Sequence, residues 1–526
     1  MNARPYQTEC LSAFDAGWAE FDRQLGILPT GSGKTIIFSW MARAAAEQGE
    51  RVLVLVDQIE LADQTVDKMR RAAQLSCEVE RAQSSASRRC SVVVATVQTM
   101  ARRLAEWVPD HFGLVIADEA DKSISEQWQL VLKHFDGHGR VAGFTATPNR
   151  TDKRNLGEYY QNIAYQIRLH ELIKQGYLSP IVVKQLPIKI DLREVRVKEG
   201  DYDRKELHDA ITPHLIEAAR AIKQHASFRK VLVFVPLIAT SVKFVEICRS
   251  EGLAAEHIDG TSEDRAEKLS RYDRGEFDVL VNSCLLLRGV DIPSIDCVFM
   301  LRPTKSITLY QQAIGRGTRL CDFKENLLLL DPFFEADKRL ICKPAHLIAE
   351  TEEEAKSIVE VAEQAAPPPG GGGEQLTALD LLGMASEAQA LRERNLRKKL
   401  EEHQEKTAKT ISAEEFALRS NHFEAAEYEP VMKWESQPIS EKQKKYLRQA
   451  GINTETVKGK GHASKLLDIY FGQKKLELAS PGAVKLMCRM RHISSAIGIT
   501  NPEHATQSEQ HRFFAELNRR KKGVTA

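Results

Sequence analysis

The chain has 526 residues, which is too long for one hydrophobic core and predicts about three domains of ordinary size. Its 74 lysines and arginines nearly balance its 73 aspartates and glutamates, so the overall charge indicates no strongly acidic or basic partner. The sequence has no run of about 18 apolar residues and no secretory leader before Arg4, so we expect a cytoplasmic protein without a membrane partner. Its nine cysteines form no C-x-x-C pair, which argues against a structural metal site.

The first predicted unit is an apolar run that ends in a glycine-rich turn, L-G-I-L-P-T-G-S-G-K-T, at Leu25–Thr35. Such a turn, followed by a helix from Ile36, predicts a phosphate-binding loop. Lys34 would reach the β and γ phosphates of ATP, and the Thr35 hydroxyl would bind Mg²⁺. Leu28 stands where the usual pattern has glycine, and a Gly/Ser turn with a surface lysine is the alternative. The expected ATP-binding residues of the loop are Thr30, Gly31, Ser32, Gly33, Lys34 and Thr35.

Further short apolar runs follow at regular intervals, separated by helical stretches. They predict a parallel sheet with helices on both faces and ligands at the carboxyl ends of the strands. One predicted strand begins at Arg51, and the others are Ser91–Thr96, Phe112–Ala117 and Arg140–Thr145.

Two of these strands run into polar clusters. Asp118 and Glu119 open the tetrad D-E-A-D, where Asp118 would hold Mg²⁺ and Glu119 would orient or deprotonate the attacking water. An acidic helix start would look the same in isolation. Thr145 and Thr147 belong to T-A-T-P, whose hydroxyls could hydrogen-bond the acidic cluster or simply form a turn.

A second α/β lobe is predicted after a connector, Leu169–Pro180, that reads as a short helix and an extended segment. The charged segment Lys198–Arg204 is expected to be rich in turns, and a helix is expected from about Ile211 to His225. The predicted strands are Ile181 to about Arg193, Val231–Val235, His257–Ile258, Val279–Asn282 and Val298–Leu301.

On a helix near the end of this lobe, Gln312, Arg316 and Arg319 are spaced by four and three residues and share one face. A glutamine that contacts water and two guanidiniums that meet developing negative charge suit phosphoryl transfer. A solvated basic helix face is the alternative.

The pattern resembles superfamily-2 helicases. Pro29–Thr35, Asp118–Asp121, Thr145–Pro148 and the stretch from Gln312 to Arg319 look like motifs I, II, III and VI, in that order. The resemblance covers about residues 1–345 and implies two tandem RecA-like parallel-sheet lobes that use ATP and Mg²⁺. It divides the chain into lobe 1 at 1–165, a connector at 166–180 and lobe 2 at 181–346.

The resemblance also implies roles for residues outside these motifs. Arg4 and Gln7 look like an adenine-recognition motif, and Gly289 and Asp291 of motif V would contact nucleotide. Residues that would couple the lobes or contact nucleic acid are Thr96, Gln98, Thr145, Thr147, His257, Gly260, Arg265 and Arg288.

Departures from the family patterns decide the branch. D-E-A-D is typical of DEAD-box RNA helicases, but Thr145 stands where they have serine and Gln312 where they usually have histidine. Two signatures against one favour the branch of restriction-enzyme translocating subunits and RadD-like repair helicases. DNA is therefore the expected partner ahead of RNA.

The remaining third of the chain differs in composition. Residues 347–375 combine an acidic stretch, read as helical at Glu350–Glu363, with a Pro/Gly linker, and 376–437 predict a helical segment with a long helix from Leu376 to about Thr407. In the predicted helical tail, 438–526, the stretch from Ser440 onward has 17 Lys and Arg against 7 Asp and Glu. It shows two degenerate repeats, beginning at Ser440 and Ser480. The tail predicts an auxiliary nucleic-acid contact or a surface for a protein partner.

We therefore expect an ATP-dependent DNA helicase or translocase with a mostly helical C-terminal region. The alternatives are an ATP-dependent RNA helicase and the motor subunit of a restriction or defence complex that does not separate strands.

Overall fold

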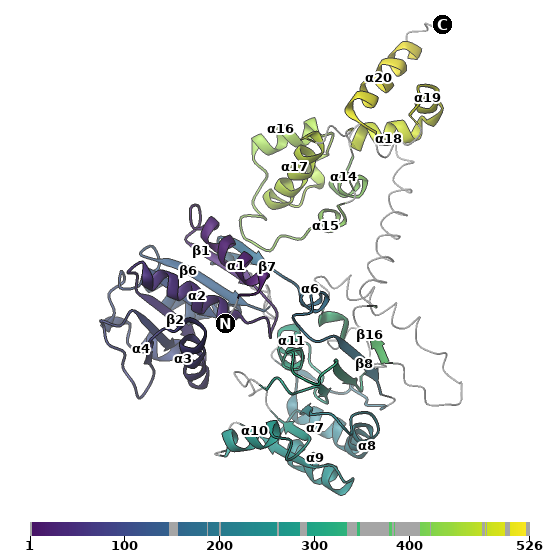
Figure 1. Cartoon of the computed structure of the whole chain (residues 1–526). Coiled ribbons are helices and arrows are strands. Elements are labelled where there is room, and N and C mark those ends of the chain that lie inside the picture. The colour runs from purple at the N-terminus through teal and green to yellow at the C-terminus, as the bar shows by residue number, and fades with distance from the viewer. Residues whose placement is uncertain are drawn as a thin grey trace, which may run out of the picture. The chain divides into compact units, whose positions relative to one another are not determined.

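The computed structural model describes residues 3–146, 156–186, 188–198, 201–259, 262, 264–283, 292–333, 344–347, 378–380, 383, 411–420, 422–475, 479, 481–499 and 505–521. The chain divides into two compact units, residues 1–389 and 390–526, which are described separately below. The first unit contains two α/β lobes and the second is helical (Figure 1).

Lobe 1 is organised on a seven-stranded parallel sheet with the order β3-β4-β2-β5-β6-β1-β7. The central strands read as continuous aliphatic runs because helices cover both of their faces. All five residues of the V-L-V-L-V strand are buried. The strands are β1 Arg23–Ile27, β2 Val52–Val56, β3 Glu78–Glu80, β4 Val92–Thr96, β5 Leu114–Asp118, β6 Arg140–Thr145 and β7 Asn162–Gln166.

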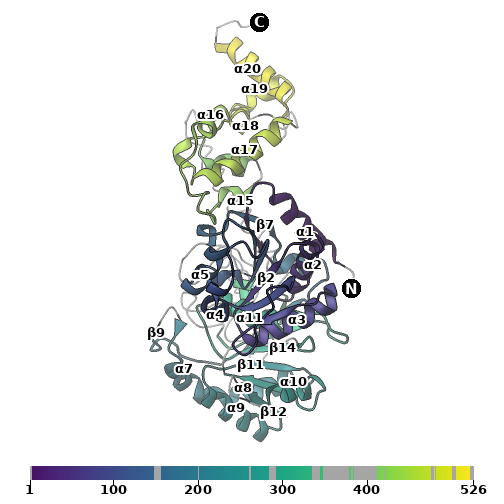
Figure 2. The same cartoon turned by 90° about the vertical axis from the view of Figure 1, so that its left-hand side faces the viewer.

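Helices lie on both faces of this sheet. They are α1 Pro5–Gly17, α2 Lys34–Glu47, α3 Ile59–Ala73, α4 Val97–Arg102 and α5 Glu126–Phe135, with 3₁₀ turns η1 Leu104–Glu106, η2 Ala120–Lys122 and η3 Leu156–Glu158. Figure 2 shows α1, α2 and α3 on one side of the sheet and α4 and α5 on the other. The strand ends that carry the predicted site therefore meet at one edge of a covered sheet.

Lobe 2 repeats this plan. Its sheet has the order β12-β13-β11-β14-β15-β8-β16, in which the first six strands are parallel and β16 pairs antiparallel with β8. The strands are β8 Ile181–Gln185, β11 Val231–Phe234, β12 Ala255–Ile258, β13 Val279–Asn282, β14 Cys297–Met300, β15 Leu327–Asp331 and β16 Ala378–Asp380. The fold class predicted from the sequence, two parallel-sheet lobes of RecA-like type, is confirmed.

The helices of the connector and of lobe 2 are α6 Leu169–Lys174, α7 Arg204–Ile211, α8 Leu215–His225, α9 Ile238–Ser250, α10 Arg265–Asp273 and α11 Ile307–Gly315, with η4 Thr212–His214 and η5 Pro344–Leu347. A small antiparallel hairpin, β9 Val197–Lys198 and β10 Asp201–Tyr202, precedes α7. One core joins the strands to α7, α8 and α9.

Several expected elements of this unit differ in the structure. The strand expected from Ile181 to about Arg193 ends at Gln185, two positions before a proline that could not donate to the ladder. The helix expected at Ile211–His225 starts instead at Leu215, after α7 and a 3₁₀ turn that contains Pro213. The long helix expected from Leu376 is wrong at Ala378–Asp380, which form an edge strand.

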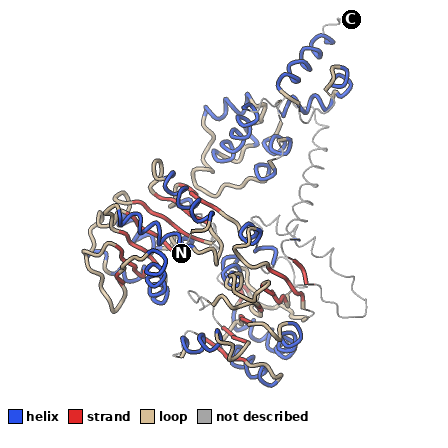
Figure 3. The backbone as a smooth tube through the Cα atoms, viewed as in Figure 1, coloured by secondary structure: helices blue, strands red, loops and turns tan. Residues whose placement is uncertain are grey.

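The C-terminal unit consists of helices (Figure 3). They are α14 Ala413–Arg419, α15 Phe423–Ala426, α16 Glu441–Gln449, α17 Lys460–Lys475, α18 Pro481–Arg489, α19 Arg491–Ala496 and α20 Gln507–Lys521, with η6 Thr454–Thr456. Two cores stabilise them, one from Ile411 to Leu467 and one from Ala479 to Leu517.

The repeats seen in the sequence lie one in each core. Ser440 caps α16, and its hydroxyl accepts a hydrogen bond from the Gln443 amide at 3.2 Å. The expected boundary at 437/438 falls inside the first core, because residues on both sides of it contribute buried side chains. The linker at 367–373 and the acidic stretch lie outside the described residues.

Candidate nucleotide site between the two lobes

The turn between β1 and α2 has the backbone of an anion-binding loop. Gly31 and Gly33 have φ values of 89° and 83°, in the left-handed region that favours glycine. Gly33 is the N-cap of α2, so the loop meets the positive end of that helix. A Cβ atom on Gly33 would lie 2.9 Å from the Gln7 amide, which leaves no room for a side chain.

The start of α1 fixes this loop from the outside. The Tyr6 hydroxyl donates to the Ser32 carbonyl at 2.5 Å, and Gln7 Nε2 donates to the same oxygen at 3.3 Å. Arg4 Nη1 donates to the Tyr177 carbonyl at 3.4 Å, and its guanidinium lies 5.3 Å from the centre of that ring. The two residues expected to recognise adenine, Arg4 and Gln7, thus contact the loop and the connector.

The acidic tetrad lies at the end of β5. The Glu119 amide donates to Asp118 Oδ1 at 3.1 Å, and the Glu119 backbone has φ 57°, a conformation that costs a residue with a side chain of order 1–2 kcal/mol. Burial and the neighbouring Glu119 charge raise the pKa of Asp118 to about 6, although Lys34 opposes this shift. Thr145 donates to Asp121 Oδ1 at 3.5 Å, so the expected link between T-A-T and the acidic cluster is present for Thr145.

Lys34 completes this cluster. Its ammonium donates to the carbonyls of Leu28 and Pro29 at 3.1 and 3.4 Å. Burial lowers its pKa, whereas the charges of Glu119 and Asp118 act in the opposite direction. One cation therefore faces several carboxylates at the edge of the lobe 1 sheet.

Lobe 2 closes this site through α11. Gln312 is 8% exposed, and its Nε2 donates to Glu119 Oε2 at 3.2 Å. Gly315 lies so close to the phosphate-binding loop that a Cβ atom there would come within 2.6 Å of the Thr30 Cβ. The motif-I and motif-VI segments are thus in direct contact within the first unit.

The helix expected to carry Gln312, Arg316 and Arg319 is shorter than predicted, because α11 ends at Gly315, with Arg316 as its C-cap and Arg319 beyond it. Both arginines are half-buried, and the Arg319 charge is close enough to lower the pKa of Lys34. In addition, a Cβ atom on Gly31 would lie 3.4 Å from Arg319 Cγ. Arg319 therefore lies beside the loop, as an arginine that meets phosphate charge must.

Asp201 holds the segment that leads into α11. Its carboxylate accepts from the Thr304 hydroxyl and the Lys305 amide at 3.0 Å each, and pairs with Arg302 at 3.4 Å. Thr304 in turn accepts from the Ser306 amide at 3.1 Å, and Ser306 caps α11. The β9–β10 hairpin thereby anchors the start of the helix that carries Gln312.

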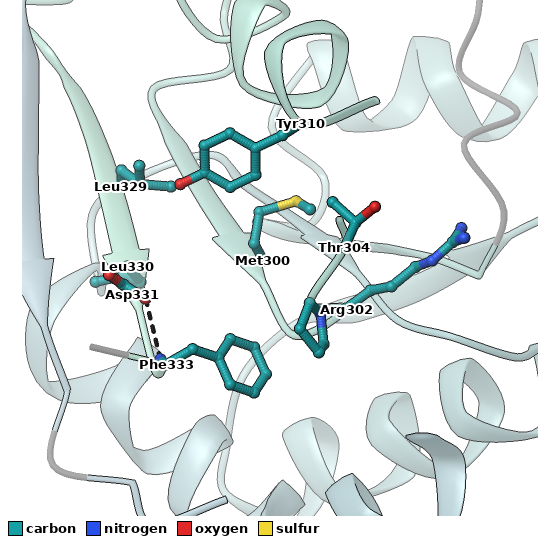
Figure 4. A pocket seen from close by; sticks show the side chains of 9 residues that line it. Met300, Arg302, Thr304, Tyr310, Leu329, Leu330, Asp331 and Phe333 are labelled. Atoms are coloured by element: carbon teal, nitrogen blue, oxygen red, sulfur yellow. Dashed lines mark hydrogen bonds between the residues drawn. The ribbon is translucent and has the colours of Figure 1, made fainter. Parts of the chain in front are cut away.

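Figure 4 shows this region at a small pocket of lobe 2, where the Arg302 side chain extends away from Asp331 and Phe333. The pocket holds about 10 Å³, about the volume that one water molecule needs. It belongs to the packing behind α11 and is too small for a nucleotide.

Lys324 fixes the turn that follows α11. Its ammonium donates to three carbonyls, those of Gly317, Arg319 and Ile295. Burial lowers the pKa of Lys324 to about 8. Carbonyls that follow a helix end are thereby satisfied, and the turn that contains Arg316 and Arg319 is fixed.

The residues expected to couple the lobes or contact nucleic acid are only partly brought together. Thr96 donates to the Thr99 hydroxyl at 2.9 Å, and Gln98 donates to the Asp57 carbonyl at 3.0 Å, at the carboxyl edge of lobe 1. In lobe 2, His257 Nδ1 lies 3.7 Å from Asp259, and Arg265 begins α10. The remaining expected residues, Thr147, Gly260, Arg288, Gly289 and Asp291, lie outside the described part of the chain.

An open groove of about 400 Å³ lies between α3 of lobe 1 and α10 of lobe 2. Asp67, Lys68 and Arg71 line it from α3, and Ser270 and Asp273 line it from α10, so its basic and acidic residues balance. Lys68 also lowers the pKa of Asp118, so the groove is electrostatically linked to the acidic tetrad.

Sequence reasoning missed four residues that build this site: Tyr6, Tyr177, Asp201 and Lys324. Tyr6 lies between Arg4 and Gln7, which look like an adenine-recognition motif, and its position beside Gln7 was the available signal. Tyr177, Asp201 and Lys324 act through contacts with residues more than 100 positions away or through backbone carbonyls, which sequence spacing does not reveal.

The site also suits a magnesium ion. Mg²⁺ in nucleotide sites takes one or two carboxylates together with phosphate oxygens, and Asp118 with the Thr35 hydroxyl offers such a set. Burial and the neighbouring Glu119 charge raise the pKa of Asp118, and a bound cation would oppose this shift.

Comparison with known proteins identifies related families. Residues 1–150 match the family described as "Type III restriction enzyme, res subunit", and residues 212–321 match "Helicase conserved C-terminal domain". The chain is 28% identical over 354 residues to "Putative ATP-dependent helicase IRC3" of Saccharomyces cerevisiae, covering 62% of this chain and 51% of that protein. It is 33% identical over 348 residues to "Putative mitochondrial ATP-dependent helicase irc3" of Schizosaccharomyces pombe, covering 63% and 57%. The chain thus spans about half the length of these curated relatives.

Two solved structures have a similar fold. A fragment of a putative HsdR subunit of a type I restriction enzyme from Vibrio vulnificus matches with TM-score 0.51 and 22% identity, covering 65% of this chain and 66% of that chain. The Type ISP restriction-modification enzyme LlaBIII bound to DNA matches with TM-score 0.54 and 16% identity, covering 100% of this chain and 40% of that one. Among the described helices, none has both the length and the apolar character needed to cross a bilayer.

Proposed function

Because the chain belongs to the superfamily-2 helicases, in their restriction-enzyme-like branch, we propose that it hydrolyses Mg²⁺-ATP and uses the energy to move along or unwind DNA. The observation that carries this proposal is the hydrogen bond between Gln312 of lobe 2 and Glu119 of lobe 1. It joins the carboxylate that would handle the attacking water to the lobe that bears Arg316 and Arg319.

Each residue of the site has a distinct role in this proposal. Lys34, with the amides of the loop, holds the β and γ phosphates, and in doing so exchanges its contacts with the Leu28 and Pro29 carbonyls for phosphate oxygens. Thr35 and Asp118 would hold Mg²⁺, whose charge would offset the negative charge of the transferred phosphoryl group. Glu119 orients the attacking water and takes its proton.

Arg316 and Arg319 meet the negative charge that develops on the phosphate oxygens. Because they belong to lobe 2, they are in place only while Gly315 and Gln312 touch lobe 1. Opening of the lobes after hydrolysis would withdraw them. The catalytic cycle and the relative motion of the lobes are therefore coupled, as stepping along a strand requires.

DNA is the proposed partner ahead of RNA. Thr145 and Gln312 argue against the DEAD-box pattern, and the family match of lobe 1 is to a restriction-enzyme subunit. The RNA alternative rests on the D-E-A-D tetrad and on relatives such as "ATP-dependent RNA helicase DBP3" of Yarrowia lipolytica, 26% identical over 344 residues.

The test is steady-state ATP hydrolysis with no polymer, single-stranded DNA, duplex DNA and single-stranded RNA, each at two salt concentrations. We expect stimulation by DNA and much less by RNA. Stimulation by RNA alone would assign the chain to the alternative, and no stimulation by any polymer would contradict a nucleic-acid motor.

Glu119→Gln is the matched control, because it keeps the size of the side chain and removes its basicity. We expect this variant to bind ATP and to lose turnover. Turnover at the wild-type rate would remove Glu119 from the mechanism.

The second alternative, a motor subunit of a restriction or defence complex, predicts a DNA-stimulated ATPase that does not unwind tailed duplexes and co-purifies with a nuclease or methyltransferase. The C-terminal unit is the proposed surface for such a partner or for nucleic acid. The cytoplasmic location stays a prediction, since the Schizosaccharomyces pombe relative is named a mitochondrial helicase.

A further inference from the structure

Three aromatic rings meet on the surface of the C-terminal unit, between α16 and α17. The Phe471 ring lies 5.3 Å from the Tyr446 ring, in an edge-to-face arrangement, and 5.3 Å from the Tyr470 ring. Phe471 is 42% exposed, although both neighbouring tyrosines are half-buried. The exposed ring of Phe471 is therefore in contact with two half-buried tyrosine rings.

The core beneath this aromatic cluster is filled by other side chains. Leu447, Leu466 and Leu467 fill the core beneath it. Gln443 Nε2 also joins the two helices through the Lys460 carbonyl and the Ser464 hydroxyl, at 3.1 Å each. The platform that presents Phe471 is thus fixed by contacts that do not involve Phe471 itself.

Basic side chains surround the cluster. Lys442 precedes Tyr446 by one turn of α16, and Lys474 and Lys475 follow Phe471 by one turn of α17, so these lysines share the faces of the rings. All three lysines are exposed. Asp468 is an acidic residue on the same face, one turn before Phe471.

The charge of the two helices as a whole has the same sign. From Glu441 to Lys475 the chain has nine Lys and Arg and three Asp and Glu. By contrast, Ile411–Glu435 of the same core has two and six. The charge of the part of the C-terminal unit built on this core is therefore unevenly distributed, with the positive charge on the helices that carry the rings.

We propose that Phe471, supported by Tyr446 and Tyr470 and flanked by Lys442, Lys474 and Lys475, is a stacking site for an unpaired base of single-stranded nucleic acid. Bases of a single strand expose their faces and stack on aromatic side chains, while lysines neutralise the adjacent phosphates. A duplex hides its base faces, so this surface selects single strands. The inference rests on the proposed function and names the partner of the C-terminal unit.

The test uses the full-length chain and titrates single-stranded oligonucleotide in the ATPase assay. We expect Phe471→Ala to raise the concentration for half-maximal stimulation at least fivefold, the lower end of the effect of losing one stacked base. The maximal rate should stay unchanged, because the catalytic site is in the other unit. Phe228→Ala, which removes a fully exposed phenylalanine of lobe 2, is the matched control and should change neither quantity.

Three further variants separate stacking from charge. Phe471→Trp should keep the wild-type affinity, whereas Phe471→Leu, which keeps apolar bulk without an aromatic face, should behave like Phe471→Ala. Lys474→Ala combined with Lys475→Ala should reduce the slope of log affinity against log salt by about 1.4, and Phe471→Ala should leave that slope unchanged.

The outcomes distinguish the two levels of the argument. If the wild type is not stimulated by any nucleic acid, the proposed function fails. If the wild type is stimulated and Phe471→Ala, Phe471→Leu and the lysine variant all match it, the stacking site is refuted and the surface serves a protein partner. Equal losses with Phe471→Ala and Phe228→Ala would also refute it.

Discussion

In the first unit of the chain, several carboxylates and one lysine converge at the carboxyl edge of a sheet, whereas in the C-terminal unit the buried side chains of Arg419 and His462 have partners within their own unit. Around Lys34, several carboxylates face one ammonium, and Asp118 has a raised pKa. In the C-terminal unit, buried Arg419 pairs with Glu415 one turn away at 3.0 Å, and His462 has partners for both ring nitrogens. The first arrangement is suited to receive the charge of a ligand, whereas the contacts of Arg419 and His462 serve the folding of their own unit.

This difference indicates which substitutions should affect the rate of ATP hydrolysis and which should affect the stability of the fold. Substitutions at the carboxyl edge of lobe 1 should change rates with little effect on folding, since the electrostatic tension there is relieved by ligand. Substitutions of buried polar groups in the C-terminal unit should change stability and leave the rate of hydrolysis alone. Four predictions follow from this contrast, in order of the size of the effect.

The largest effect is expected for Lys34→Ala. Loss of the ammonium removes the phosphate contact, so ATP hydrolysis should fall by about a thousandfold or more. The circular dichroism spectrum should stay that of the wild type. Lys133→Ala, at an exposed position on α5 of the same lobe, should retain full activity; turnover by Lys34→Ala would contradict the phosphate-binding assignment.

Gln312→Ala should lower kcat by about a hundredfold, because it removes the hydrogen bond that Gln312 of lobe 2 donates to Glu119 of lobe 1. ATP binding should be retained, since the phosphate-binding loop is unchanged. Ile307→Ala, an exposed position on the same helix, provides the control. A fall in ATP affinity without a fall in kcat would show that Gln312 serves binding and not the coupling of the lobes.

A smaller effect is expected for Asp201→Ala, which frees the segment before α11 from three contacts. We expect kcat to fall about tenfold, with the KM for ATP changed less than twofold, because Asp201 positions Gln312 and the arginines without touching lobe 1. Asp201→Asn keeps an acceptor oxygen and should be intermediate.

Asp203→Ala is the matched control for that variant. Asp203 caps α7 through the amides of Lys205 and Glu206, so its loss should lower the stability of lobe 2 and leave kcat unchanged. Equal losses of kcat in both variants would mean that Asp201 acts only through the stability of lobe 2.

The smallest effect concerns pH and the C-terminal unit. Burial lowers the pKa of His462 to about 4. Since the unfolded chain binds this proton near pH 6.5, the unfolded state takes up more protons between these values, and stability falls as pH falls through that window. Between pH 7.5 and 5.5 the loss should be about 1 kcal/mol.

Hydrogen exchange of peptides from α17 measures this loss. His462→Gln has no titrating group and should show exchange that is independent of pH after correction for the intrinsic rate. Equal pH dependence in the wild type and in His462→Gln would assign the effect to another group, and ATP hydrolysis by the two proteins should be the same.

The sequence was sufficient for those parts of the site in which a strand, a turn and a helix follow one another. The phosphate-binding loop and the acidic tetrad each lie directly after a buried strand, and the carboxyl ends of parallel strands meet at one edge. The contact between Gln312 and Glu119 joins residues 193 positions apart, and only the resemblance to helicases suggested it.

The missed strands have physical explanations. The strand β15 is a run of four leucines before an aspartate, and without β-branched residues such a run does not distinguish a strand from a buried helix. The strand β7 lies at the edge of its sheet with half-buried residues, so its apolar pattern is weak. Asp201 lies in a charged stretch expected only to turn, and its role depends on a loop about 100 positions later.

The left-handed backbone conformation of Glu119 lowers the stability of the protein at a residue that we propose is needed for ATP hydrolysis. A non-glycine residue with a φ of 57° is conformationally strained, so the folded chain is less stable with glutamate at this position than with glycine. Glu119→Gly should therefore melt at a higher temperature than the wild type while hydrolysing no ATP, and the flexibility that glycine adds to the unfolded chain should reduce this gain. Glu119→Asn, which tolerates the same conformation with less of that entropy, separates the two contributions.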